Sequence, residues 1–193
     1  MKYPTLNCDL LKEHFFPIGQ EMPRENWDEL SVSPWSEENG SAVVHILLKD
    51  GEKYAFVVNK SDKRRNKRSG IGLPTKEVRN GELPLDAAER AIRDELNLDA
   101  LLFSISLNPK PLSVRKNGRK TIHIIFTGTA KFREWRKKII DSNREVREAI
   151  FIDPFSSIHI KTRKKNGRTV TDAMLLGRLV YPSHLGIVAL SLQ

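Results

Sequence analysis

Three carboxylates and one guanidinium lie close together in the middle of the chain, at Glu82, Arg90, Asp94 and Glu95. Side chains three or four residues apart on a helix share a face, so Arg90 and Asp94 would be neighbours if this segment is helical. Carboxylates on one helix face, beside a loop that contains Gly81, can hold a divalent cation. The same pattern fits a solvated helix face in which Arg90 and Asp94 form an ordinary ion pair. The residues alone leave both interpretations open.

The segment from Lys76 to Leu98 resembles the Nudix box, whose pattern is G-x5-E-x7-R-E-U-x-E-E-x-G-U with U aliphatic. The spacing matches without a gap, and the Leu-Pro before the box and the Ala-Ala within the helix also fit. The wider resemblance runs over residues 41–180. The positions of the box that agree with the family are Glu82, Arg90, Ile92, Asp94 (an Asp for a Glu), Glu95 and Leu98.

This resemblance implies a fold and an activity. The implied fold is a Nudix-like α/β/α sandwich with a mixed sheet. The implied activity is hydrolysis of the diphosphate bond in a nucleoside diphosphate linked to another moiety. Such a reaction uses Mg²⁺ or Mn²⁺ to stabilise charge on the phosphoryl oxygens and to activate water. The implied catalytic residues are Glu95, Asp94 and Arg90, and the implied metal ligands are Glu95, Asp94, Glu82 and either Glu148 or Glu145.

Several positions depart from the box. Ala91 stands where the family has a metal-ligating glutamate, four residues before Glu95, so the shared-metal pair is broken. Lys76 replaces the first glycine and would be strained if its backbone had to be left-handed. Asn97 replaces the late glycine, a milder change because asparagine tolerates that conformation. Glu82 has a second interpretation, as the partner of Arg90 at the start of the helix.

Two functions therefore stay open. The first is a divergent Nudix-type hydrolase that depends on a divalent metal. The alternative is a catalytically degenerate Nudix-fold protein that binds a nucleotide or RNA as a sensor or assembly subunit. An ammonium group of Lys76 at the metal position would favour the alternative.

The charge of the chain favours anionic partners. The formal net charge is +9, although residues 1–40 hold eight acidic and only three basic residues. Candidate groups for binding substrate phosphates are Lys76, Arg64, Arg65 and Arg68. Basic runs at residues 63–68, 115–120, 136–138 and 161–168 predict a nucleic-acid partner if they share one face, and solvated turns if they do not.

Hydrophobic patterning predicts the elements that position these residues. A strand hairpin turns at Asp50-Gly51, and a helix over 85–96 follows Pro84. His45 and His123 lie inside strand patterns and are expected to be packing residues. The expected strands are 42–48, 54–58, 101–107, 121–131, 149–152 and the apolar ending 187–192, and a late helix is expected over 171–180.

The 193 residues suffice for one domain with an extension. We expect an acidic extension at 1–40, packed on the body through Trp27 and Trp35, and a Nudix-like domain at 41–193. The single cysteine, Cys8, excludes an intramolecular disulfide and a Cys-cluster zinc site. No window approaches the roughly 18 apolar residues of a membrane span, and the N-terminus lacks the pattern of a signal peptide. We therefore expect a cytoplasmic protein with no membrane partner, and the sequence leaves the oligomeric state open.

Overall fold

The structure is a computed structural model that describes residues 4–15, 20–21, 33–36, 38, 40–60, 70–98, 103–107, 112–116, 119–132 and 146–190. The elements in these residues are α1 (Cys8–His14), β1 (Gln20–Glu21), β2 (Ser41–Asp50), β3 (Lys53–Asn59), β4 (Ile71–Gly72), β5 (Thr75–Glu77), α3 (Pro84–Ala91), η3 (Ile92–Leu96), β6 (Phe103–Leu107), β7 (Leu112–Lys116), β8 (Arg119–Ala130), β9 (Val146–Ile152), α4 (Pro154–Ser157), β10 (His159–Lys165), β11 (Arg168–Leu175), β12 (Arg178–Val180) and α5 (Pro182–Leu190).

Strand β2 lies at the centre of a mixed sheet. It runs parallel to β8 and antiparallel to β5, and the turn at Gly51 (φ 61°) joins it to β3 as the hairpin signal predicts. The hydrogen-bonded path is β1-β7-β8-β2-β3-β4-β12-β11-β10, and β5, β6 and β9 pair with β2, β8 and β3 off this path. Parallel and antiparallel pairs in one sheet confirm the mixed sheet that the sequence predicts.

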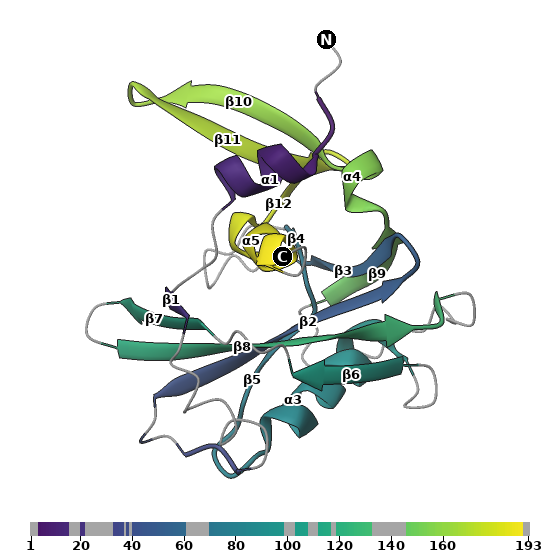
Figure 1. Ribbon diagram of the computed structural model, residues 1–193, viewed down its shortest axis with the longest axis vertical. Coiled ribbons are helices and arrows are strands. Elements are labelled where there is room, and N and C mark those ends of the chain that lie inside the picture. The colour runs from purple at the N-terminus through teal and green to yellow at the C-terminus, as the bar shows by residue number, and fades with distance from the viewer. Residues whose placement is uncertain are drawn as a thin grey trace.

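Each face of the sheet carries its own hydrophobic core, because successive side chains of a strand point to opposite faces. On β2, Val44 and Ile46 pack in a core with α3 and η3, whereas Leu47 belongs to a second core with α1 and α5. Figure 1 shows α3 on one side of the central strands and α1 and α5 on the other. These three layers confirm the predicted α/β/α sandwich.

The helix that carries the acidic residues begins at Pro84, as predicted. Proline is suited to the first helical position because its missing N–H has no helical partner there. From Ile92 the helix widens into the π-helical turn η3, and it ends at Asn97 in the left-handed conformation (φ 52°, ψ 43°). The helix predicted over 85–96 is confirmed, but its π-helical last turn was not predicted.

The described parts of the N-terminal 40 residues pack into both cores. Leu6, Leu11 and Phe15 are buried in the core under α5, and Trp35 is buried in the core under α3. The backbone joins the body as well: the Leu6 N–H donates to Ile158 O at 2.7 Å. The division of the chain between residues 40 and 41 stays a prediction, and Trp27 lies outside the described residues.

Two predictions for the C-terminal part are wrong. Residues 171–180 belong to β11, a turn and β12 rather than to a helix, in keeping with the β-branched Thr169, Val170 and Thr171. Residues 187–190 lie in α5 rather than in a strand, whereas 191–192 lie outside the described residues. In a short apolar run that is buried on several sides, the spacing of polar and apolar residues does not distinguish a helix from a strand.

Candidate functional site

Strand β5 places Lys76 against the end of the helix. The pair Val44–Lys76 puts the lysine on the face of the sheet that α3 covers. Lys76 Nζ lies 3.2 Å from Glu95 Oε1 and 3.7 Å from Asp94 Oδ2. The side chains of Lys76 and Glu95 are each 8% exposed, so this ion pair is buried. Lys76 has the extended backbone of a strand, so the left-handed strain considered for this position does not arise.

The carboxylate of Glu95 is bound from two sides. Besides facing the ammonium group through Oε1, it accepts a hydrogen bond from the Thr75 N–H on Oε2 at 3.0 Å. A buried charge needs such compensation, because transfer of an unpaired carboxylate from water is costly. Asp94 is more open, with 25% of its side chain exposed. The two acidic residues of the box thus face a lysine from β5.

Glu82 and Arg90 form a second charged pair, on the loop side of α3. Arg90 Nε and Nη2 donate to the two oxygens of Glu82, both at 2.9 Å, and the Arg79 N–H donates to Glu82 at 2.8 Å. Burial alone would raise the pKa of Glu82, but these hydrogen bonds and the nearby guanidinium charges lower it. The hydrogen bonds to Glu82 raise the pKa of Arg90. Arg90 Nη2 also donates to Glu77 O, so this pair fastens the loop to the helix.

Ala91, the residue in place of the box glutamate, is fully buried in the core under α3. Its methyl group supplies no ligand, and its neighbours in the core are apolar. Among the described residues, no group of three or more His, Cys, Asp or Glu side chains could hold a metal ion. With Lys76 directed at Glu95 and Asp94, and Glu82 engaged by Arg90, the donor set does not fit a divalent cation.

The remaining predicted site residues do not join this cluster within the described chain. Glu148 lies on β9, directly opposite Val58 of β3, a residue of the core under α5 rather than of the core under α3. The other predicted residues, Arg64, Arg65, Arg68 and Glu145, lie outside the described residues.

Three histidines meet on the opposite face of the sheet, a cluster that sequence analysis missed. His45 Nε2 and His123 Nδ1 lie 2.8 Å apart, and the ring of His184 from α5 packs edge-on against His45 with centroids 5.2 Å apart. His184 Nδ1 accepts a hydrogen bond from the Leu73 N–H at 2.8 Å. The Thr75 hydroxyl lies 3.3 Å from His45 Nδ1, and the Thr75 N–H donates to Glu95. Thr75 of β5 therefore contacts both the histidine cluster and Glu95. The sequence signal that could have revealed this cluster is the presence of His45 and His123 inside apolar strand patterns.

The surroundings of the histidine cluster disfavour the protonated form of each ring. Burial, followed by proximity to His184 and His123, lowers the pKa of His45 well below its usual value. Burial also lowers the pKa of His123, and burial together with the neighbouring His123 lowers the pKa of His184 to about 4. Three adjacent cations would repel one another, so the close packing of these rings favours their uncharged forms.

No protein-family model matches the sequence, and no curated protein matches it. Solved structures match in fold. The pyrophosphohydrolase BsRppH of Bacillus subtilis is 16% identical with a TM-score of 0.47, and the match covers 64% of this chain and 65% of that chain. A NUDIX hydrolase from Nitrosomonas europaea is 14% identical (TM-score 0.44; 58% and 72% covered). An Ap4A hydrolase from C. elegans is 14% identical (TM-score 0.42; 57% and 77% covered).

At 14–16% identity, the likeness to these structures is one of fold alone. The chain spans a little under two thirds of the length of BsRppH. In the part of the chain that the structure describes, no helix combines the length and the apolar character that crossing a membrane demands.

Proposed function

We propose that the chain is a catalytically degenerate Nudix-type protein that binds a nucleotide-type ligand without metal-dependent hydrolysis. The observation that carries this proposal is the ammonium group of Lys76, 3.2 Å from Glu95 Oε1 and 3.7 Å from Asp94 Oδ2. A cation fixed by the chain supplies the positive charge that two carboxylates otherwise take from a divalent metal. Ala91 removes a further ligand at the same place.

The nature of the ligand rests on the box resemblance, which implies a nucleoside diphosphate linked to another group. The basic residues Arg64, Arg65 and Arg68 stay our proposed contacts for its phosphates. Lys76 is a weaker candidate for this role than the sequence suggests, because its charge already faces two carboxylates. Binding is therefore expected to continue in the presence of a chelator.

The test combines turnover with binding on the same samples. Wild type, Glu95→Gln, and a box-restored Lys76→Gly/Ala91→Glu variant are incubated with dinucleoside polyphosphates, nucleotide sugars, ADP-ribose and nucleoside triphosphates, with Mg²⁺ or Mn²⁺. Wild type should release no more product than Glu95→Gln. ADP-ribose and a nucleotide sugar should still bind to wild type in EDTA, as measured by calorimetry.

Two results would overturn different parts of the proposal. Metal-dependent turnover by wild type that vanishes in Glu95→Gln would establish a hydrolase and refute the degenerate site. Absence of both turnover and nucleotide binding would refute the ligand class while leaving the assignment of Lys76 in place. Turnover that appears only in the restored variant would show that Lys76 and Ala91 together suppress the activity in the wild type.

The divergent hydrolase is the second candidate, and two observations favour it. Asp94 and Glu95 keep the positions of the acidic pair, and Asn97 adopts the left-handed conformation that the box glycine would take. A metal-dependent enzyme would require the Lys76 side chain to leave the carboxylates, so its activity should increase when the lysine is shortened.

A further inference from the structure

Strands β10 and β11 form a basic β-hairpin. The hairpin lies at one end of the strand path, and β1, β7 and β8 lie at the other end. Strands β10 and β11 pair through seven registered positions, from His159–Met174 to Lys165–Arg168. Asn166 and Gly167 close the turn with positive φ values of 51° and 75°. Figure 1 shows the hairpin extending past α1 at the top of the molecule. Seven residues in a strand extend over roughly 20 Å.

One face of this hairpin packs on the body and the other carries its charge. Directly paired residues share a face, and Ile160 and Ala173 on one face are buried in the core under α5. The opposite face carries the side chains that pair as Lys161–Asp172, Arg163–Val170 and Lys165–Arg168. All the basic residues in these pairs are exposed.

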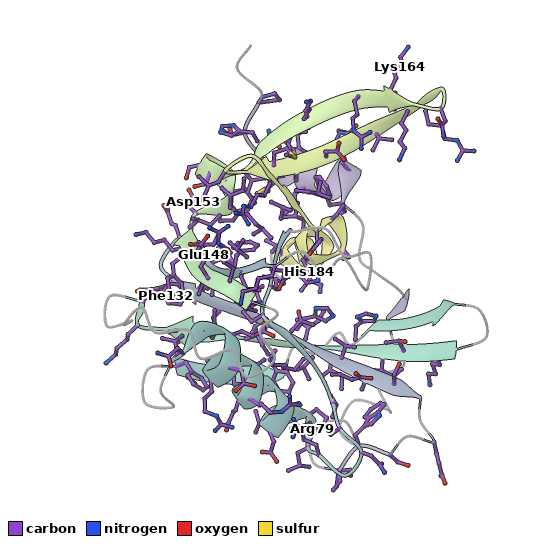
Figure 2. The ribbon with its side chains drawn as sticks, turned by 180° about the vertical axis from the view of Figure 1, so that it is seen from behind. Arg79, Phe132, Glu148, Asp153, Lys164 and His184 are labelled. Carbon is purple, nitrogen blue, oxygen red and sulfur yellow. The ribbon has the colours of Figure 1, made fainter. Side chains whose placement is uncertain are left out.

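The acidic side chains of the hairpin do not balance this charge. Residues 159–180 contain six basic residues and one acidic residue, Asp172, which binds Arg163 through its Oδ2 at 2.5 Å. Lys165 and Arg168 are directly opposite each other, an arrangement that is unfavourable between like charges. Lys164, near the tip on the other face, points into solvent in Figure 2. A polyanion that lies along the ribbon would relieve this repulsion.

We propose that the β10–β11 hairpin binds the phosphate backbone of a double-stranded nucleic acid. A two-stranded ribbon has a width that the major groove of B-DNA admits, and Lys and Arg along it can contact successive phosphates. Residues 159–175 contain no Phe, Trp or Tyr, so the ribbon lacks the aromatic platform typical of single-strand binding. This inference does not rest on the proposed function, because Lys76 and the box lie on other elements.

The experiment measures binding of fluorescent 20-base-pair DNA, the RNA duplex of the same sequence and one single strand, by anisotropy over a series of salt concentrations. The test variant carries Lys164→Gln, Lys165→Gln and Arg168→Gln. The control variant removes three exposed charges elsewhere, with Lys49→Gln, Lys53→Gln and Arg147→Gln. Both variants have the same net charge, and circular dichroism melts verify that they are folded.

Wild type and the control variant should bind a duplex with affinity that falls steeply as salt rises. The hairpin variant should lose at least about tenfold in affinity, and its log–log salt slope should decrease by about 2.7, the value for three phosphate contacts. A preference for DNA or for RNA identifies which duplex the hairpin serves. The inference is overturned by absence of duplex binding, by stronger binding to the single strand, or by an equal loss in the control variant.

Discussion

At the scale of single residues, the pair Glu82–Arg90 shows how a box position can serve the fold. Both Glu82 oxygens accept hydrogen bonds from Arg90, and one also accepts from the Arg79 N–H. The spacing of the box predicts that Glu82 and Arg90 matter, but the spacing does not separate a metal ligand from an ion-pair partner. That distinction depends on where the loop folds back on the helix, which is a contact between residues eight apart.

We predict that Glu82→Gln lowers the free energy of unfolding by about 1–3 kcal/mol at neutral pH, because a charge-assisted bidentate pair is lost. The folded-state pKa of Glu82 lies below its usual value of 4.5. Its contribution to stability is therefore fully present above pH 4.5 and is lost as pH falls through the lowered value. Urea unfolding of wild type and Glu82→Gln across this range tests the prediction. A difference that stays constant down to the lowest pH would contradict it.

At the scale of elements, the helix was predictable because Pro84 and the apolar stripe of α3 are local signals. The π-helical turn at Ile92–Leu96 was not predicted. The position of Lys76 was not predictable either, because it depends on the register of β5 against β2. The C-terminal elements were predicted wrongly for a similar reason. Helix α5 is apolar on all sides because it is buried by α1 and the sheet, so no periodicity marks it as a helix.

The left-handed end of η3 gives a backbone prediction. Asn97→Ala should lower the free energy of unfolding by about 1 kcal/mol, because alanine lacks the short polar side chain that lets asparagine tolerate the left-handed conformation at φ 52°. Asn97→Gly should stay within about 0.5 kcal/mol of wild type, since glycine adopts this conformation freely. Thermal unfolding of the two variants side by side provides the measurement. Equal stability of Ala and Gly would show that the conformation at this residue is not left-handed in solution.

We predict that the histidine cluster makes the docking of α5 dependent on pH. Burial, and then the neighbouring His123, lowers the pKa of His184 from 6.5 to about 4 in the folded protein. The unfolded chain binds protons first, so stability is full above pH 6.5 and declines as pH falls toward 4, by at most about 1.4 kcal/mol per pH unit for each histidine.

His184→Gln should flatten this decline, whereas His159→Gln, an exposed histidine on β10, should leave it unchanged. Chemical unfolding measured above pH 6.5 and down to about 4 distinguishes the two variants. Equal pH slopes for wild type and both variants would exclude a role for the cluster.

At the scale of the whole molecule, the N-terminal segment completes both cores. Leu6, Leu11, Phe15 and Trp35 are all no more than 5% exposed. The composition of residues 1–40, acidic and rich in proline, predicts an extension that packs on the body, but it gives no contact partners. Those partners are far away in the sequence, in α5, in the strand β10 and in the loop before α3.

We predict that a chain beginning at residue 41 does not fold stably. Four buried apolar side chains contribute about 1.5–3 kcal/mol each, which together matches the total stability of a typical domain. Limited proteolysis and thermal melting of chains 1–193 and 41–193 provide the comparison. Melting of the shorter chain within a few degrees of the full chain would show that residues 1–40 are an appendage.

The most direct test of the central claim, that Lys76 takes the place of a metal, is a titration of Mn²⁺ into wild type and Lys76→Met, with Lys53→Met as the exposed control. Wild type and the control should gain no stability from Mn²⁺. Lys76→Met should lose about 3–5 kcal/mol because Glu95 is left unpaired. It should regain about 2.7 kcal/mol when Mn²⁺ exceeds its Kd by about a hundredfold. Stabilisation of wild type by Mn²⁺ that disappears in Glu95→Gln would contradict the claim and establish a metal site in the native protein.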